Sequence, residues 1–226
     1  MNRILEPELM EGEAQSRAYA QADFEQPNSH FLYLLQEHIG TDFQGYVLDL
    51  GCGSGDITIR VARAYPRCEI HGIDGSAAML KYARELLALE PITCQQRVQF
   101  IQGIIPEEKL PRAHRRCAFG ARYDLIISNS LLHHLHQPDN FWLTIKKYSS
   151  KNTPILVMDL LRPATTAEAS QLVETIALNE PEILQRDFYN SLCAAFEIPE
   201  IKTQLKQANL EHLSVTQISD RHVLIR

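Results

Sequence analysis

The 226-residue sequence has little of what would place a protein in a membrane or outside the cell. Its five cysteines are never closer than 16 positions, so the chain has no CxxC pair for zinc binding or thiol exchange. No stretch approaches the roughly 18 apolar residues that span a bilayer, and the first residues lack the basic end and apolar run of a signal peptide. We therefore expect reduced thiols, a cytoplasmic location and no membrane partner.

Positive charge is also scarce. The chain has 22 Lys and Arg against 28 Asp and Glu, a net charge of −6, which argues against nucleic acid as a partner. An apolar fraction of 45% suits one globular core. One local cluster is basic, and we expect it to form a solvated loop. It comprises Lys109, Arg112, Arg115, Arg116 and Arg122.

Short apolar runs alternate with stretches whose apolar residues recur at helical spacing. Five runs are typical of buried parallel strands: 46–50, 69–73, 98–101, 123–127 and 155–158. Helical patterns between them cover 57–65, 76–87, where Ser76 is the expected cap, and 138–149. Parallel neighbours need right-handed crossovers, so this alternation predicts a doubly wound α/β sheet with helices on both faces.

The two ends of the chain have different patterns. Residues 1–27 are acidic and could form a solvated leader or a mobile arm, and Asn28 is the expected cap of a helix that Gly40 ends. Residues 162–211 are helical and too long for an ordinary connection, so we expect them to cover a site. The last residues predict an antiparallel hairpin. We expect a single domain, 1–226, divided into an N-terminal arm and helix (1–45), a core (46–160), a helical cap (161–211) and a closing hairpin (212–226).

A glycine-rich turn follows the first strand. Gly51, Gly53 and Gly55 let the backbone approach a ligand, and the next helix presents unpaired N–H groups there. A dinucleotide fold uses GxGxxG instead, and here the third glycine comes one residue early. Asp49, just before the turn, would repel a pyrophosphate but could hold an ammonium group.

A second acidic residue, Asp74, ends the second strand. In doubly wound folds a carboxylate there accepts hydrogen bonds from ribose hydroxyls. The two sites together describe a ligand with an amino-acid end and a nucleoside end. S-adenosylmethionine is such a ligand.

On these motifs the sequence resembles the class I S-adenosylmethionine-dependent methyltransferases, and most closely their small-molecule branch related to ubiquinone and menaquinone methyltransferases. The resemblance implies a Rossmann-like sheet of seven strands with an antiparallel last strand, a helical N-terminal arm, and a helical insertion between strands five and six. The segments that carry it are VLDLGCGSGD (47–56), IHGIDGSAAML (70–80), VQFIQGI (98–104), YDLIISNSLLHHL (123–135) and the closing strands.

The resemblance also implies the roles of individual residues in binding S-adenosylmethionine, whose product is S-adenosylhomocysteine. The turn from Gly51 through Cys52 and Gly53 to Gly55 would wrap the methionine moiety, and Asp74 would bind the ribose. The adenine would lie near Gly75 and Met79, and the methyl-donor end near Asn129 and Ser130. Many relatives have Asp after the glycine that ends strand three, but here Ile104 follows Gly103, so Ile104 is the expected apolar contact of the adenine.

Two further groups are candidates near the reacting atoms. His133 and His134 follow the fourth strand and could act as a base or orient the substrate, or one could bond the loop while the other faces solvent. Three histidines within four residues also suggest a metal, but adjacent side chains on a turn rarely converge, so we expect no metal site. Tyr19 and Phe24 could close over the cofactor as an aromatic lid or simply pack the arm.

The function predicted is methyl transfer from S-adenosylmethionine to a small-molecule acceptor by in-line displacement. A methyltransferase-like binding or assembly subunit without turnover is the first alternative, and a nicotinamide-dependent oxidoreductase the second. Nucleic-acid methylation is disfavoured because Asn129-Ser-Leu-Leu stands where an Asn-Pro-Pro-aromatic signature would be. The acceptor and the oligomeric state stay open.

Overall fold

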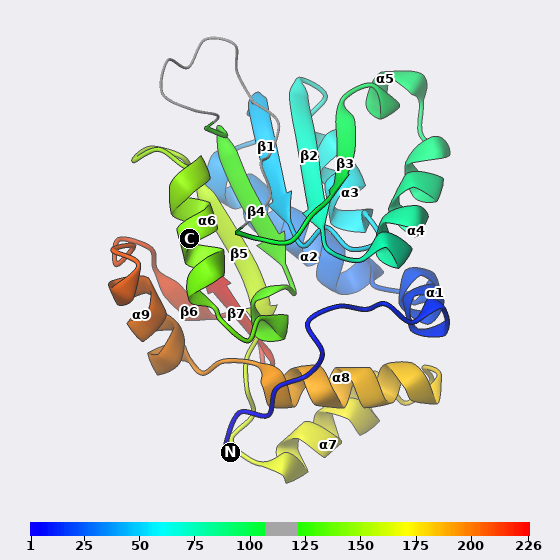
Figure 1. Cartoon of the computed structure of the whole chain (residues 1–226), viewed down its shortest axis with the longest axis vertical. Coiled ribbons are helices and arrows are strands. Elements are labelled where there is room, and N and C mark those ends of the chain that lie inside the picture. The colour runs from blue at the N-terminus through cyan, green and yellow to red at the C-terminus, as the bar shows by residue number, and fades with distance from the viewer. Residues whose placement is uncertain (107–121) are drawn as a thin grey trace.

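A central sheet of seven strands organises the protein in the computed structural model, which describes residues 1–106 and 122–226 (Figure 1). The strands lie in the order β3-β2-β1-β4-β5-β7-β6. Their bounds are β1 Gly45–Leu50, β2 Cys68–Asp74, β3 Val98–Gln102, β4 Leu125–Asn129, β5 Ile155–Leu160, β6 Val215–Gln217 and β7 His222–Ile225. Of the predicted basic cluster, only Arg122 lies within the described residues.

The strand pairing confirms the predicted α/β class. β1 pairs in parallel with β2 and β4, and β4 pairs in parallel with β5. β7 runs antiparallel to both β5 and β6, as the closing hairpin predicts. The chain builds outward from β1 to β3 and then returns to β4. Such a reversal of strand order opens a crevice at the carboxyl ends of β1 and β4, where ligands bind in doubly wound folds.

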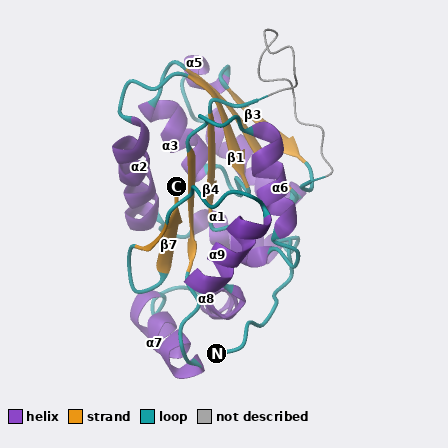
Figure 2. Ribbon diagram, turned by 90° about the vertical axis from the view of Figure 1, so that its left-hand side faces the viewer, coloured by secondary structure: helices purple, strands orange, loops and turns teal. Residues whose placement is uncertain are grey.

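Helices cover both faces of the sheet (Figure 2). The helices α2, α3 and α4 cover one face, and α6 and α9 cover the other. The bounds are α1 Glu13–Gln21, α2 Glu25–Ile39, α3 Asp56–Ala64, α4 Ala77–Ala88, α5 Ile92–Gln95, α6 Asp139–Tyr148, α7 Thr166–Ile176, α8 Glu182–Ala194 and α9 Ile198–Gln207, with a 3₁₀ turn, η1, at Leu132–His134.

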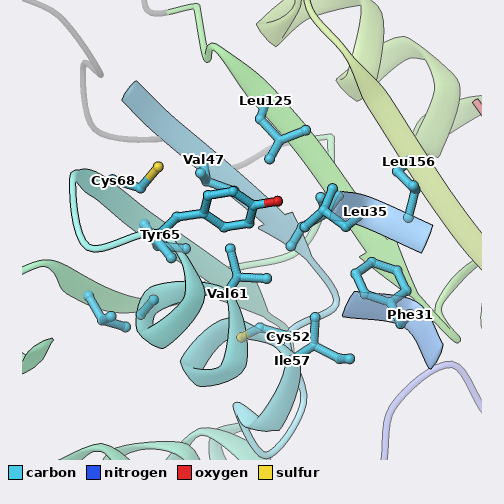
Figure 3. Packing of buried hydrophobic residues seen from close by; sticks show 14 of the residues in the cluster. Phe31, Leu35, Val47, Cys52, Ile57, Val61, Tyr65, Cys68, Leu125 and Leu156 are labelled. Atoms are coloured by element: carbon cyan, nitrogen blue, oxygen red, sulfur yellow. The ribbon is translucent and has the colours of Figure 1, made fainter. Parts of the chain in front are cut away.

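The core on the α2 and α3 side is made of apolar side chains from both layers. Figure 3 shows Phe31 and Leu35 of α2 and Val61 of α3 pointing towards Val47 and Leu125 of the sheet. All five are completely buried. Removing such side chains from water is the main favourable contribution to folding, about 1.5–3 kcal/mol for each.

One of the two predicted helix caps is correct. The hydroxyl of Ser76 accepts a hydrogen bond from the N–H of Met79 at 3.1 Å, which caps α4 as expected. Asn28 is not a cap, because α2 already begins at Glu25. Its buried side-chain amide instead donates to Asp56 at the start of α3, 2.5 Å away. A tertiary partner therefore overrides the capping preference of asparagine.

The N-terminal segment and the helical insertion meet below the sheet (Figure 1). Residues 1–12, here called the N-terminal strap, run beside α8 towards α1 (Figure 1), and the N–H of Ile4 donates to the carbonyl of Cys193 at 3.0 Å. The helices α7 and α8 pack on each other around Leu192. The third helix of the insertion, α9, packs on the sheet through Ile201 and Leu205. In the described ranges, no helix combines the length and apolar character needed to cross a bilayer.

A buried hydrogen bond between α6 and α9 gives a stability prediction. The indole N–H of Trp142 donates to Gln204 Oε1 at 2.9 Å, and both side chains are buried. Gln204→Met leaves the indole donor without its acceptor and should lower the free energy of unfolding by about 1–3 kcal/mol. Urea denaturation measures the change, and Gln207→Met, at an exposed position of α9, is the matched control. Equal effects of the two substitutions would contradict this account.

Candidate active site

A cavity of about 570 Å³ lies at the carboxyl ends of β1, β2 and β4. Its size is within the range of small-molecule sites. Thirteen of the fifteen residues predicted for the site line it, and Gly55 and His133 do not. The thirteen are Tyr19, Asp49, Gly51, Cys52, Gly53, Asp74, Gly75, Met79, Gly103, Ile104, Asn129, Ser130 and His134.

The glycine turn is shaped by left-handed backbone at Gly51, Gly53 and Gly55. Gly53 lines the cavity at φ 52°, and an added Cβ would meet only the end of the Met79 side chain at 3.3 Å. An added Cβ on Gly55 would lie 2.8 Å from the ring of Phe100. Gly53 therefore keeps the cavity open, whereas Gly55 permits α3 to pack closely on β3 and α4.

The carboxylate of Asp74 connects this turn to the start of α4. One oxygen accepts from the N–H of Gly53 at 2.9 Å, and the other accepts from the N–H of Ser76 at 2.8 Å. Burial raises the pKa of Asp74, although both hydrogen bonds oppose the rise. Each carboxylate oxygen can accept a second hydrogen bond, so the group can still receive hydroxyl donors from the cavity.

Asp49 is the most deeply buried acidic group in the cavity wall, with 1% of its surface exposed. Its Oδ2 accepts from the hydroxyl of Thr58 at 2.6 Å. Burial raises its pKa to about 7; the Thr58 hydrogen bond lowers it and the charge of Asp74 adds to the rise. A cationic ligand group beside Asp49 would favour its charged form.

The N-terminal segment closes one side of the cavity. Leu9 packs against Gly75, and the hydroxyl of Ser76 donates to the carbonyl of Met10 at 2.6 Å. Tyr19 and Phe24 both line the cavity with ring centroids 4.7 Å apart. Burial, followed by the nearby charge of Asp74, raises the pKa of Tyr19 to about 12, so its hydroxyl stays protonated.

The loop after β4 contributes an unpaired polar group. Asn129 Oδ1 is buried without a hydrogen-bond partner and lines the cavity. Buried polar atoms are normally paired, so this acceptor can receive a donor from a bound molecule. Ser130 follows with φ 57°, a conformation that non-glycine residues adopt mainly at constrained sites.

The two predicted histidines have different surroundings. His133 is buried, and its Nδ1 lies 2.6 Å from Asp159 at the end of β5. Burial lowers the pKa of His133, but the charges of Asp159 and Glu6 outweigh this effect and raise it. The same imidazole keeps the pKa of Asp159 low despite burial. His134 lines the cavity, and burial followed by the charge of His133 lowers its pKa to about 3.

Sequence reasoning missed four residues around this pair. Glu6 and Glu8 come from the N-terminal strap: Glu6 Oε1 lies 3.2 Å from Nδ1 of His134, and Glu8 accepts from the N–H of His136 at 2.7 Å. Arg3 fixes the strap by donating to the carbonyls of His133 and Leu135. Asp159 was missed because the fifth strand was predicted to end at 158. The acidity of residues 1–27 was the one available signal.

The charge of the cavity is one-sided. Four carboxylates line it, and no lysine or arginine does so among residues 1–106 and 122–226. The four are Glu8, Asp49, Asp56 and Asp74. A cavity wall lined by carboxylates favours a cationic ligand and disfavours a ligand that carries phosphates.

Comparisons with known proteins find similarity to methyltransferases. Residues 48–154 match the family described as "Methyltransferase domain". The chain is 30% identical over 110 residues to a malonyl-[acyl-carrier protein] O-methyltransferase of Halalkalibacterium halodurans, which covers 49% of this chain and 37% of that protein. It is 36% identical over 83 residues to a ubiquinone/menaquinone biosynthesis C-methyltransferase of Syntrophotalea carbinolica. This match covers 34% of this chain and 32% of that protein.

A solved structure extends the similarity to nearly the whole fold. A SAM-dependent methyltransferase from Aquifex aeolicus superposes with a TM-score of 0.64 over 93% of this chain and 96% of that one, at 15% identity. The chain spans well under half the length of the two curated relatives. Residues 48–154 thus match a methyltransferase domain, and the fold is that of a SAM-dependent methyltransferase, in agreement with the resemblance found in the sequence.

The contrast between Gly53 and Gly55 gives a second stability prediction. Both have positive φ, but only Gly55 lacks space for a side chain. Gly55→Ala should therefore lower the free energy of unfolding by about 1–3 kcal/mol more than Gly53→Ala does, because overpacking adds to the backbone penalty. Chemical denaturation of the two variants tests the difference, and a smaller or reversed difference would rule out tight packing at Gly55.

Proposed function

We propose that the chain binds S-adenosylmethionine in this cavity and transfers its methyl group to a small-molecule acceptor. The observation that carries the proposal is the one-sided charge of the cavity, with four carboxylates among its lining residues. The ligand has a sulfonium, an ammonium and one carboxylate group and no phosphate, so its net charge is positive and suits such a wall. A nicotinamide dinucleotide would bring its pyrophosphate beside Asp49 and Asp74.

We assign each end of the cofactor by the donors and acceptors that it needs. The ammonium group would lie near Asp49 beside the backbone of Gly51 and Gly53. The ribose hydroxyls would donate to Asp74, whose two oxygens are already oriented by backbone N–H groups. Apolar contacts from Met79 and Ile104 would hold the adenine beside Gly75 and Gly103, and Cys52 contributes a small side chain to the turn. Tyr19 would cover the ligand from the arm.

The acceptor would bind on the side of Asn129, Ser130 and His134. The two curated relatives are named for methyl transfer to oxygen and to carbon, and we propose that this chain acts on a small molecule of one of these kinds. Methyl transfer needs alignment of the nucleophile with the methyl carbon in a site without water. A neutral His134 at the cavity wall would be able to orient the acceptor, whereas its low pKa makes it a poor proton acceptor.

Calorimetric titration with S-adenosylmethionine, S-adenosylhomocysteine and NADH tests the cofactor. We expect both adenosyl ligands to bind and NADH not to bind. Asp74→Asn should weaken binding by at least about tenfold, because a hydrogen bond to a charged group contributes about 1.5–3 kcal/mol. The matched control is Asp42→Asn, which removes a fully exposed carboxylate.

The same titrations separate the competing functions. Tight NADH binding with no adenosyl binding would replace the proposal with an oxidoreductase. Adenosyl binding without methyl transfer to a broad panel of oxygen and carbon acceptors would instead favour a binding or assembly subunit.

The raised pKa of Asp49 predicts a proton released on binding. Its carboxyl is protonated below about pH 7 in the free protein, and a nearby ammonium group would lower that pKa. Binding of S-adenosylhomocysteine should therefore release close to one proton per site near pH 6 and almost none near pH 8.5. Affinity should rise with pH over the same interval. Calorimetry in buffers of different ionisation enthalpy counts the protons.

Asp49→Asn is the control for this measurement. It keeps the size of the side chain but cannot lose a proton, so the pH-dependent release should disappear. A release that is unchanged in Asp49→Asn would assign the proton to another group and contradict the proposed contact.

A further inference from the structure

A cluster of metal-ligating groups lies next to the acidic cavity. It consists of Glu6 from the N-terminal strap and the adjacent His133 and His134 of η1. Glu6 Oε1 lies 3.6 Å from Nε2 of His133 and 3.2 Å from Nδ1 of His134. The three ligand atoms all lie within 4.8 Å of one another. The two adjacent histidines do converge, although side chains on a turn rarely do.

Two atoms of the cluster have no hydrogen-bond partner. Glu6 Oε1 and His134 Nδ1 are both buried without a hydrogen-bond partner. The Glu6 side chain is only 9% exposed, and its unpartnered oxygen faces both imidazoles. Native proteins rarely leave two such atoms facing each other, because each has lost its water. A cation between them would satisfy all three ligand atoms at once.

The two distances from Glu6 fit a transition-metal ion. Zinc binds imidazole nitrogen and carboxylate oxygen at about 2.0–2.2 Å in tetrahedral geometry, which sets neighbouring ligand atoms about 3.4 Å apart. The two measured separations from Glu6, 3.6 Å and 3.2 Å, lie on either side of this value. Two histidines and one carboxylate also form a set found in catalytic zinc sites, which keep a fourth position open.

Neighbouring residues hold His133 and Glu6 in the orientations that a zinc site requires. Nδ1 of His133 is bonded to Asp159, which leaves its Nε2 as the nitrogen that faces Glu6. Asp159 is itself fixed by the N–H groups of Leu132 and Leu160 at 2.7 and 2.8 Å. Ligating histidines commonly have a carboxylate behind them in this way. The second oxygen of Glu6 accepts from Ser191 of α8 at 3.2 Å.

We propose that Glu6, His133 and His134 bind one divalent transition-metal ion of the Zn²⁺ type, with its open position towards the cavity that His134 lines. The site needs the N-terminal strap in place, since the strap supplies Glu6. Metal binding does not depend on the methyl transfer proposed above. Its consequence for the reaction does rest on that function: an acceptor oxygen in the open position would lose its proton more readily.

Metal titration of the full chain tests the proposal. Protein freed of metal with a chelator is titrated with Zn²⁺ by calorimetry and with Co²⁺ by visible absorption, which reports four-coordinate geometry. We expect one equivalent to bind. Glu6→Gln and His134→Gln should weaken binding at least tenfold, and Asp159→Asn by roughly 10–100-fold through the orientation of His133.

Two exposed groups outside the cluster give matched controls. Glu11→Gln removes another strap carboxylate, and His212→Gln removes an exposed histidine; both should bind metal as the wild type does. No stoichiometric binding by the wild type, or equal affinity in Glu6→Gln, would overturn the proposal. S-adenosylhomocysteine titration of the metal-free protein separates this failure from failure of the proposed function, and circular dichroism shows whether each variant is folded.

Discussion

The cavity depends on the carboxylate of Asp74, which connects the loops at two neighbouring strand ends into one edge. It accepts backbone N–H groups from the glycine turn after β1 and from the start of α4 after β2. The glycine turn can lie beside Asp74 because Gly53 tolerates a left-handed backbone conformation next to the cavity. Parallel pairing of β1 with β2 brings the two loops to the same edge. The start of α4, the glycine turn and the carboxylate of Asp74 thus form one continuous surface.

The N-terminal strap completes this edge from the far end of the sequence. It packs Leu9 on Gly75, bonds Ser76 through the carbonyl of Met10, and directs Glu6 at the histidines of η1. Arg3 anchors it by stacking 3.8 Å from the centre of the Phe196 ring. Since the cavity wall includes strap residues, entry and release of a cofactor should be coupled to movement of this segment.

The sequence predicts the parts of the site that lie within one strand and its following turn. The glycine turn, Asp74 and the Ser76 cap are local patterns: Gly51, Gly53 and Asp74 line the cavity, and Ser76 caps α4. Contacts between distant segments leave no such pattern. Asn28 was expected to cap α2 but pairs with Asp56 of α3, and Asp159 meets His133 from a neighbouring strand. The acidic N-terminal residues were visible, but the groups that they contact were not.

The most direct test of the account is a crystal structure of the protein with S-adenosylhomocysteine. The account predicts ribose hydroxyls within hydrogen-bond distance of Asp74, the ammonium group beside Asp49, and the sulfur on the side of Asn129 and His134. An adenosyl ligand bound elsewhere, or bound here with its ribose away from Asp74, would contradict the central claim that the acidic cavity is the cofactor site.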